Sequence, residues 1–201
     1  MLQHLRPAVA MILSFTLLTG VAYPLAVTGV AWVMLHDAAL GSLIVGKDGK
    51  VVGSSLVGQA FTNNKYFHPR PSATSAPDPA DPSKTVDAPY NAANSTGSNL
   101  GPITQKLIDR VKGDVAALRA QGVTGPIPVD AVTTSSSGLD PHMSPAAAVL
   151  QVPRVAKARA LPEERVRALV SDHVEGRALG LFGEPHVNVL ELNLALDALT
   201  H

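Results

Sequence analysis

The stretch Pro7–His36, PAVAMILSFTLLTGVAYPLAVTGVAWVMLH, decides the architecture of this chain of 201 residues. Arg6 is the only charged side chain before Asp37, so nothing inside the stretch carries a formal charge. Roughly 20 apolar residues are enough to cross the hydrocarbon core of a bilayer. A cleaved secretory signal is the alternative, but its apolar core usually spans only about 7–15 residues. The sequence therefore predicts a retained single-pass transmembrane helix over residues 8–35, after a short N-terminus of residues 1–7.

The predicted helix carries a pattern of small residues. Ala22, Ala26 and Gly29 follow an i, i+4, i+7 spacing, so they share one face, and small residues allow another helix to approach closely in lipid. We expect this face to pack against a membrane partner. Pro24 lacks an amide hydrogen and predicts a kink in the span. Trp32 lies near one end, where an aromatic residue would meet the interface.

Composition limits what the remainder, residues 37–201, can be. The whole chain has 16 basic and 16 acidic side chains, and a balanced charge does not favour nucleic acid as a partner. The absence of cysteine excludes disulfides and thiolate metal sites. Basic residues flank both ends of the apolar stretch, so charge alone leaves the membrane orientation open.

The pattern of the remainder predicts a small α+β domain. Two short strands are expected at residues 41–44 and 51–57, joined by an Asp-Gly turn. The Pro-, Ser-, Asp-, Asn- and Gly-rich segment 72–102 predicts a long polar surface loop. Apolar periodicity and start signals predict four helices. They cover residues 103–120, 144–158, 162–175 and 187–199, with extended segments at 126–129 and 132–134. Pro153 predicts either a kink in the second helix or its division into two segments.

The segment Ser135–Ala148, SSSGLDPHMSPAAA, gathers serines, an aspartate and a histidine. The chain contains no G-x-S-x-G, so a serine hydrolase is disfavoured. A turn followed by a helix start explains the same residues. Gly138 provides backbone freedom, and Asp140 can accept hydrogen bonds from nearby amides. Ser144 is a good N-cap and Pro145 a good first helical residue.

Motifs for metals and nucleotides are not found in the sequence. His68, His142, His173 and His186 are scattered, with no H-E-x-x-H and no EF-hand loop. There is also no phosphate-binding G-x-x-x-x-G-K-[ST]. We therefore expect no metal site, no catalytic residue and no cofactor that this chain requires.

Several longer strings carry a resemblance. LLTGVAYPL lies in the span, and YFHPRPSA at 66–73, GSNLGP at 97–102, SGLDPHMSPAAAVLQVPRVAKAR at 137–159 and VNVLELNLALD at 187–197 follow in order. Together they closely resemble the KdpC family, the accessory C subunit of the bacterial potassium-transporting P-type ATPase. The resemblance implies three partners: a channel-like A subunit, an ATP-hydrolysing B subunit and a small F subunit. It also implies a cytoplasmic N-terminus and an extracytoplasmic domain in the cell membrane.

The resemblance implies two alternative roles. The first is a non-catalytic accessory subunit that supports assembly, stability and potassium transport. The second is a catalytic chaperone that binds ATP and raises the ATP affinity of the B subunit, with Gln151 matching the family's discussed nucleotide contact. The second role conflicts with the implied topology, because ATP is cytoplasmic while the domain faces outward. The first role is therefore the leading expectation.

Overall fold

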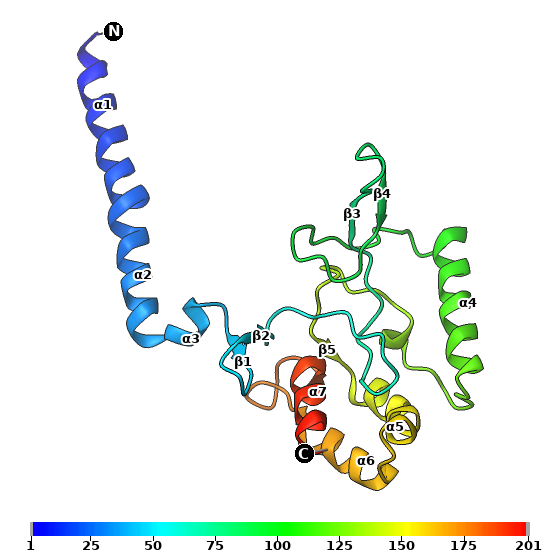
Figure 1. Ribbon diagram of the computed structural model, residues 1–201. Helices are drawn as coiled ribbons and strands as arrows, with labels where there is room; N and C mark the ends of the chain where they lie inside the picture. Colours follow the sequence, from blue (N-terminus) through cyan, green and yellow to red (C-terminus); the bar gives the residue numbers. More distant parts are fainter. Residues whose placement is uncertain (1, 200–201) are drawn as a thin grey trace. The chain divides into compact units, whose positions relative to one another are not determined.

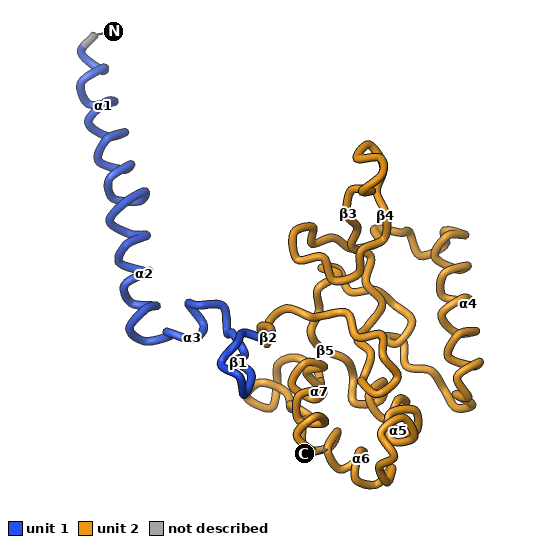
Figure 2. Tube along the Cα trace, viewed as in Figure 1, with its two compact units in different colours: residues 1–52 blue, residues 53–201 orange. Residues whose placement is uncertain are grey.

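The computed structural model describes residues 2–199 and divides the chain into two compact units, Met1–Val52 and Gly53–His201 (Figure 2). The first unit is dominated by consecutive helices: α1 (Leu2–Leu17), the π-helical turn η1 (Leu18–Ala22), α2 (Tyr23–Met34) and the short α3 (His36–Ala39). Gln3–Met34 form one continuous helical stretch, long and apolar enough to cross a membrane. The described side chains of this stretch are almost all exposed, as a lipid-facing helix requires.

The π-helical turn has a local cause. Pro24 has no amide hydrogen, and its ring would clash with the carbonyl of Gly20, four residues earlier. In η1 the backbone widens, so that the Tyr23 amide donates to the carbonyl of Leu18, five residues back. The disturbance predicted at Pro24 therefore takes the form of a wider turn, and the helix continues through it.

Two strands follow the helices. Strands β1 (Leu43–Val45) and β2 (Val51–Ser54) form a two-stranded sheet. The turn between them is closed by a 2.8 Å hydrogen bond from the Gly46 amide to the Lys50 carbonyl. The predicted second strand, 51–57, is too long, because the chain turns back after Ser54 in a tight bridge with Val57.

The long polar surface loop predicted at 72–102 also contains two short strands. Strands β3 (Ser75–Pro77) and β4 (Thr85–Asp87) pair antiparallel there and form the projecting hairpin of Figure 1. The Asp78 amide donates to the Lys84 carbonyl across the turn, at 2.9 Å. Short polar strands of three residues carry no apolar alternation, and this hides them in the sequence.

Helix α4 (Gln105–Ala120) begins two residues later than predicted and runs along one side of the second unit (Figure 1). Its half-buried positions, among them Leu107, Val111 and Leu118, share one face. The segment after it differs from the expectation. Val129–Ala131 form a 3-10 turn, and the described chain has no strand at either 126–129 or 132–134.

The core of the second unit is built from α5 (Pro145–Arg159), α6 (Glu163–Asp172) and α7 (Val189–Ala198) around a small sheet. Three short strands pair antiparallel in the order β5 (His142–Met143), β7 (His186–Asn188), β6 (Val174–Glu175). The predicted helices 162–175 and 187–199 were therefore too long, because each includes a strand at one end. Side chains with no more than 1% exposure fill the core: Phe67, Val152, Val155, Val166, Val170, Val187, Leu192 and Leu196.

Of the two alternatives predicted at Pro153, a kink or a helix in two segments, the second is wrong. Helix α5 continues through Pro153, which lies on the exposed face, while Val152, Val155 and Ala156 face the core. The hydrogen bond that proline removes is therefore lost on the solvent side, where water can replace it.

Candidate functional site

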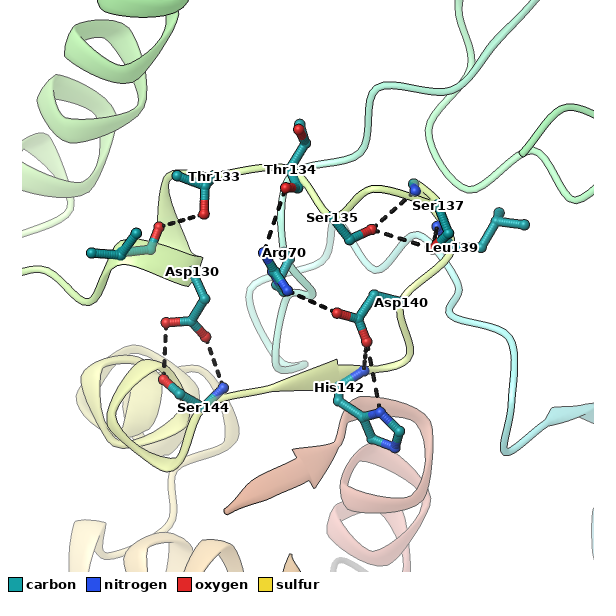
Figure 3. A network of polar contacts seen from close by, with 12 residues as sticks. Arg70, Asp130, Thr133, Thr134, Ser135, Ser137, Leu139, Asp140, His142 and Ser144 are labelled. Carbon is teal, nitrogen blue, oxygen red and sulfur yellow. Dashed lines mark hydrogen bonds and ion pairs between the residues drawn. The ribbon is translucent and has the colours of Figure 1, made fainter. Parts of the chain in front are cut away.

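The segment of serines, aspartate and histidine forms a polar turn beside β5 (Figure 3). Its side chains bind backbone: the Ser135 hydroxyl accepts from the Gly138 amide at 2.9 Å, and Asp140 accepts from the His142 amide at 3.0 Å. Arg70 approaches from a distant part of the chain and forms a 2.8 Å ion pair with Asp140. Gly138 has a φ of 66°, and a Cβ there would lie 2.5 Å from a methyl carbon of Thr74.

The end of the turn starts α5. Ser144 is its N-cap, and the hydroxyl accepts a hydrogen bond from the Ala147 amide at 3.1 Å. Pro145 is the first helical residue. Asp130 holds the cap from the other side, accepting from the Ser144 amide at 2.7 Å and from its hydroxyl at 2.9 Å. The polar residues of the turn are thus engaged in holding backbone, the role that the turn-and-cap interpretation gives them.

The structure brings together two histidines that the sequence leaves apart. The rings of His142 on β5 and His186 on β7 meet edge to face, with centroids 4.3 Å apart. Oδ1 of Asp140 lies 3.6 Å from Nδ1 of His142, and Oε2 of Glu175 lies 3.7 Å from Nε2 of His186. Burial and the neighbouring His186 lower the pKa of His142 below its usual 6.5, against the opposing effect of the carboxylates.

The histidine pair borders an open hollow of about 450 Å³. Its wall also includes Arg70, Asp130 and Glu184. Within residues 2–199, no group of three or more potential ligand side chains is arranged to hold a metal ion. His68 and His173 lie elsewhere: His68 contacts Arg154 and the Asn63 carbonyl, and the His173 ring pairs with the Leu169 carbonyl.

Gln151, the residue that the resemblance associates with nucleotide, pairs with the backbone of its own chain. Its side-chain oxygen accepts from the His68 amide at 2.8 Å, and its side-chain nitrogen donates to the His68 carbonyl at 2.9 Å. The oxygen also accepts from Arg154 at 2.6 Å. A ligand that contacted this amide would have to replace bonds that already fix the chain.

Asn193 on α7 makes the same pair of hydrogen bonds with the backbone of Phe67, the residue before His68. Its oxygen accepts from the Phe67 amide at 2.8 Å and its nitrogen donates to the Phe67 carbonyl at 3.0 Å. We call Gln151 and Asn193, with the backbone of Phe67 and His68, the paired-amide clamp. The clamp ties one extended segment to two helices that lie far along the chain.

Further contacts hold the same segment on either side of the clamp. Arg159 donates to the Lys65 carbonyl at 2.7 Å and forms a 2.6 Å ion pair with Asp197, although its side chain is only 6% exposed. The Tyr66 hydroxyl bonds to the same aspartate at 3.0 Å. The roles of these residues and of Asn193 were not predicted from the sequence. One signal was present: Asn193 is a polar residue on the apolar face of VNVLELNLALD.

Two hollows border Gln151 between α5 and the end of α4. The first measures about 80 Å³ and the second about 270 Å³, and they share Leu118, Gln151 and Arg154. Small-molecule pockets usually measure about 300–1,000 Å³. Neither hollow alone reaches this range, but both share Gln121 and Arg154 with a third hollow of about 480 Å³, so size does not decide whether a nucleotide fits.

The membrane-helix residues lie in the first unit. Ala22 ends the π-helical turn, and Ala26 and Gly29 lie on α2. All three are exposed, and a Cβ built on Gly29 meets nothing within 4 Å. The spacing therefore leaves an open strip of small side chains on the helix surface.

Comparison with known proteins gives one consistent result. The family model described as "K+-transporting ATPase, c chain" matches residues 5–198. A KdpC subunit of a potassium-transporting ATPase from Methylobacterium nodulans is 65% identical over 199 residues, covering 99% of this chain and 98% of that protein. The corresponding proteins of Rhodopseudomonas palustris and Bradyrhizobium diazoefficiens are 64% and 62% identical, each over 98% of this chain and 98–99% of their own length.

An apolar helix followed by an α+β domain defines the chain as a membrane-anchored protein with one small folded domain. The polar side chains that attract attention in the sequence are largely occupied in holding the fold of that domain. The match over nearly the whole length shows the family. The chain belongs to the KdpC family, whose members are subunits of potassium-transporting ATPases.

Proposed function

We propose that this chain is a non-catalytic accessory subunit that stabilises the assembled potassium-uptake complex. The observation that carries the proposal is the paired-amide clamp. The side-chain amide of Gln151, which the resemblance associates with nucleotide, makes two hydrogen bonds to the His68 backbone. The partners are the channel-like A subunit, the ATP-hydrolysing B subunit and the small F subunit that the family resemblance implies. The domain acts by contact with these partners.

The alternative role, binding ATP to raise the affinity of the B subunit, has one observation in its favour. The hollow of about 270 Å³ beside Gln151 is open and includes Arg154, a cation that could face phosphate. The two roles differ in what Gln151→Ala does to the purified complex. An accessory role predicts lower thermal stability and an unchanged KM for ATP in the complexes that assemble.

A matched control separates a nucleotide contact from a weakened fold. Tyr66→Phe removes the hydrogen bond to Asp197 and so loosens the same extended segment, but Tyr66 borders neither hollow. If Gln151→Ala raises the KM for ATP while Tyr66→Phe of similar thermal stability does not, the accessory role is insufficient. Loss of ATP binding by the full-length chain itself would then establish the alternative.

The proposal places the domain on the outer side of the cell membrane, with the N-terminus in the cytoplasm. The chain has no cysteine, so one introduced thiol reports the side without background from this subunit. Lys84→Cys suits the test because this side chain is 72% exposed at the turn of the β3–β4 hairpin. A membrane-impermeant maleimide should label it in intact spheroplasts. Labelling only after lysis would reverse the orientation.

The strip formed by Ala22, Ala26 and Gly29 is the proposed packing surface of the anchor. Gly29→Leu fills the strip without adding polarity, so it should reduce co-purification with the partners while membrane insertion persists. Ala31→Leu is the control: Ala31 lies nine residues, or two and a half turns, from Ala22 and so faces the opposite side. Equal effects of both changes would show that the strip is not the packing surface.

A further inference from the structure

The segment Arg177–Glu184, RALGLFGE, between β6 and β7 presents large apolar side chains to solvent. Leu179 is 90% exposed, Leu181 74% and Phe182 67%. Single exposed apolar side chains are common on soluble domains, but here three occur within four residues, and clusters of exposed apolar side chains mark interaction sites. We call this segment the apolar hairpin.

The apolar hairpin has a defined backbone. The Ala178 amide donates to the Phe182 carbonyl at 2.8 Å, and the Phe182 amide returns a bond of 3.0 Å to the Ala178 carbonyl. Arg177 closes the base by donating to both carboxylate oxygens of Glu184, each at 2.8 Å. The three apolar side chains therefore project from a fixed turn.

This turn holds Leu179 in an unfavourable conformation. Leu179 has a φ of 54°, in the left-handed region, which costs about 1–2 kcal/mol for a residue with a Cβ. A glycine or asparagine would avoid this cost, and a polar residue would avoid exposing the side chain. Leucine at this position is unfavourable for the isolated domain on both counts. Burial against another molecule would compensate for both.

The charges of the apolar hairpin favour protein over lipid as that molecule. Segments that bind lipid surfaces combine apolar side chains with basic residues attracted to anionic headgroups. The only basic residue of the apolar hairpin is Arg177, and Glu184 neutralises it. Glu175, just before the apolar hairpin, adds a side chain that is 58% exposed and negative. The apolar hairpin therefore presents apolar side chains at its tip and a net negative charge at its foot. These features fit an apolar protein pocket whose rim carries basic residues.

We propose that the apolar hairpin inserts into such a pocket on a partner subunit of the potassium-transporting ATPase, on the side of the membrane where this domain lies. The inference rests on the proposed function, since it assigns the contact through which the accessory domain holds its partner. It is specific to residues 177–184, and other parts of the domain could carry assembly if it fails.

The first test identifies the neighbour of the apolar hairpin. The photoreactive amino acid p-benzoylphenylalanine, incorporated at position 179 during synthesis of the full co-expressed complex, places one photoreactive group at the tip before the contact forms. We expect a covalent adduct with a subunit of the ATPase. The same amino acid at position 103 is the control, because Ile103 is 89% exposed and lies outside the apolar hairpin. Adducts with lipid alone, or equal subunit adducts from both positions, would overturn the proposal.

The second test measures the contribution of the contact. Leu179→Asn removes the apolar side chain and places there a residue that tolerates the left-handed backbone, so thermal stability of the isolated full-length chain should not fall. Combined with Leu181→Asn, it should weaken retention of the partners in mild detergent by at least about tenfold, as expected for loss of a central interface cluster. Ile103→Asn, the matched loss of an exposed apolar side chain, should leave retention unchanged.

The outcomes also separate this inference from the proposed function. Full retention by the double variant overturns the role of the apolar hairpin. If deletion of residues 53–201 still destabilises the complex in the same assay, the accessory role stands while the apolar hairpin is excluded. If neither change affects the complex, both proposals fail.

Discussion

Asn193 gives the sharpest test of how this domain is held together. The side chain is 2% exposed and makes both hydrogen bonds to the backbone of Phe67, which is fully buried. Asn193→Ala would leave a buried amide and a buried carbonyl without partners. Each such group costs about 1–3 kcal/mol, so the variant should lose about 4 kcal/mol of stability. In a domain of this size that loss lowers Tm by roughly 8–16 °C.

Thermal unfolding of the full-length chain in mild detergent, followed by circular dichroism, measures this loss. A second variant tests the geometry as well as the size of the effect. Asn193→Asp keeps the acceptor for the Phe67 amide but turns a carboxylate oxygen toward the Phe67 carbonyl. That contact is repulsive when the carboxyl is ionised and becomes a hydrogen bond when it is protonated, so folding should raise its pKa.

The pH dependence of the aspartate variant then has a defined sign. The folded state binds the proton more tightly than the unfolded state, so the variant gains stability relative to the wild type as the pH falls. We therefore expect its deficit in Tm to be largest at neutral pH and to shrink on acidification. A deficit that stays constant between pH 7 and pH 4, or an alanine variant with unchanged Tm, would refute the two-bond pairing.

Three other changes probe the polar turn. Gly138→Ala should lower the free energy of unfolding by roughly 2–4 kcal/mol, because the residue is left-handed and its Cβ would lie 2.5 Å from Thr74. Gly122 is also left-handed but has open space around it, so Gly122→Ala should lower the free energy of unfolding by only about 1 kcal/mol in the same melting assay. Ser144→Ala removes the N-cap and the hydroxyl that donates to Asp130, so the fall in Tm should reflect a loss of about 1–2 kcal/mol in the free energy of unfolding, while transport persists. Loss of potassium uptake in a folded, assembled variant would contradict a structural role. The pKa of His142 is lowered by folding, so the unfolded state binds the proton more readily and stability should decline as pH falls below about 6.5; His142→Gln should flatten this part of the Tm profile, and an unchanged profile would exclude the effect.

The helices were predictable because each carries an apolar stripe, although their ends were placed correctly only where the capping signals are clear. Ser144 and Pro145 mark the start of α5 within one residue, since capping depends only on neighbours in the chain. Pro153 misled because its effect depends on which face of the helix meets solvent, which a local rule does not contain.

The strands and the clamp escaped prediction for a different reason. Strands β5 and β6 have two residues each, too few to show alternation, and they exist only because β7 lies between them. Gln151 was singled out by a resemblance, but its pairing with His68 spans 83 positions, and that of Asn193 with Phe67 spans 126. No local pattern specifies which backbone groups a distant amide will meet. Family membership could be predicted from the sequence, because several long segments resemble the family in the same order along the chain.

The span of the paired-amide clamp also sets the order of events during synthesis. Phe67 is made early, but its buried amide and carbonyl find their partner only when Asn193, on the last helix, has been translated. Chains elongate at about 5–20 residues per second, so this segment waits on the order of ten seconds with its contacts unmade. Released chains that end before residue 193 should therefore remain protease-sensitive in the domain, and the released full-length chain should be resistant. The segment around Phe67 is therefore fixed only in chains that contain Asn193, 126 positions further along.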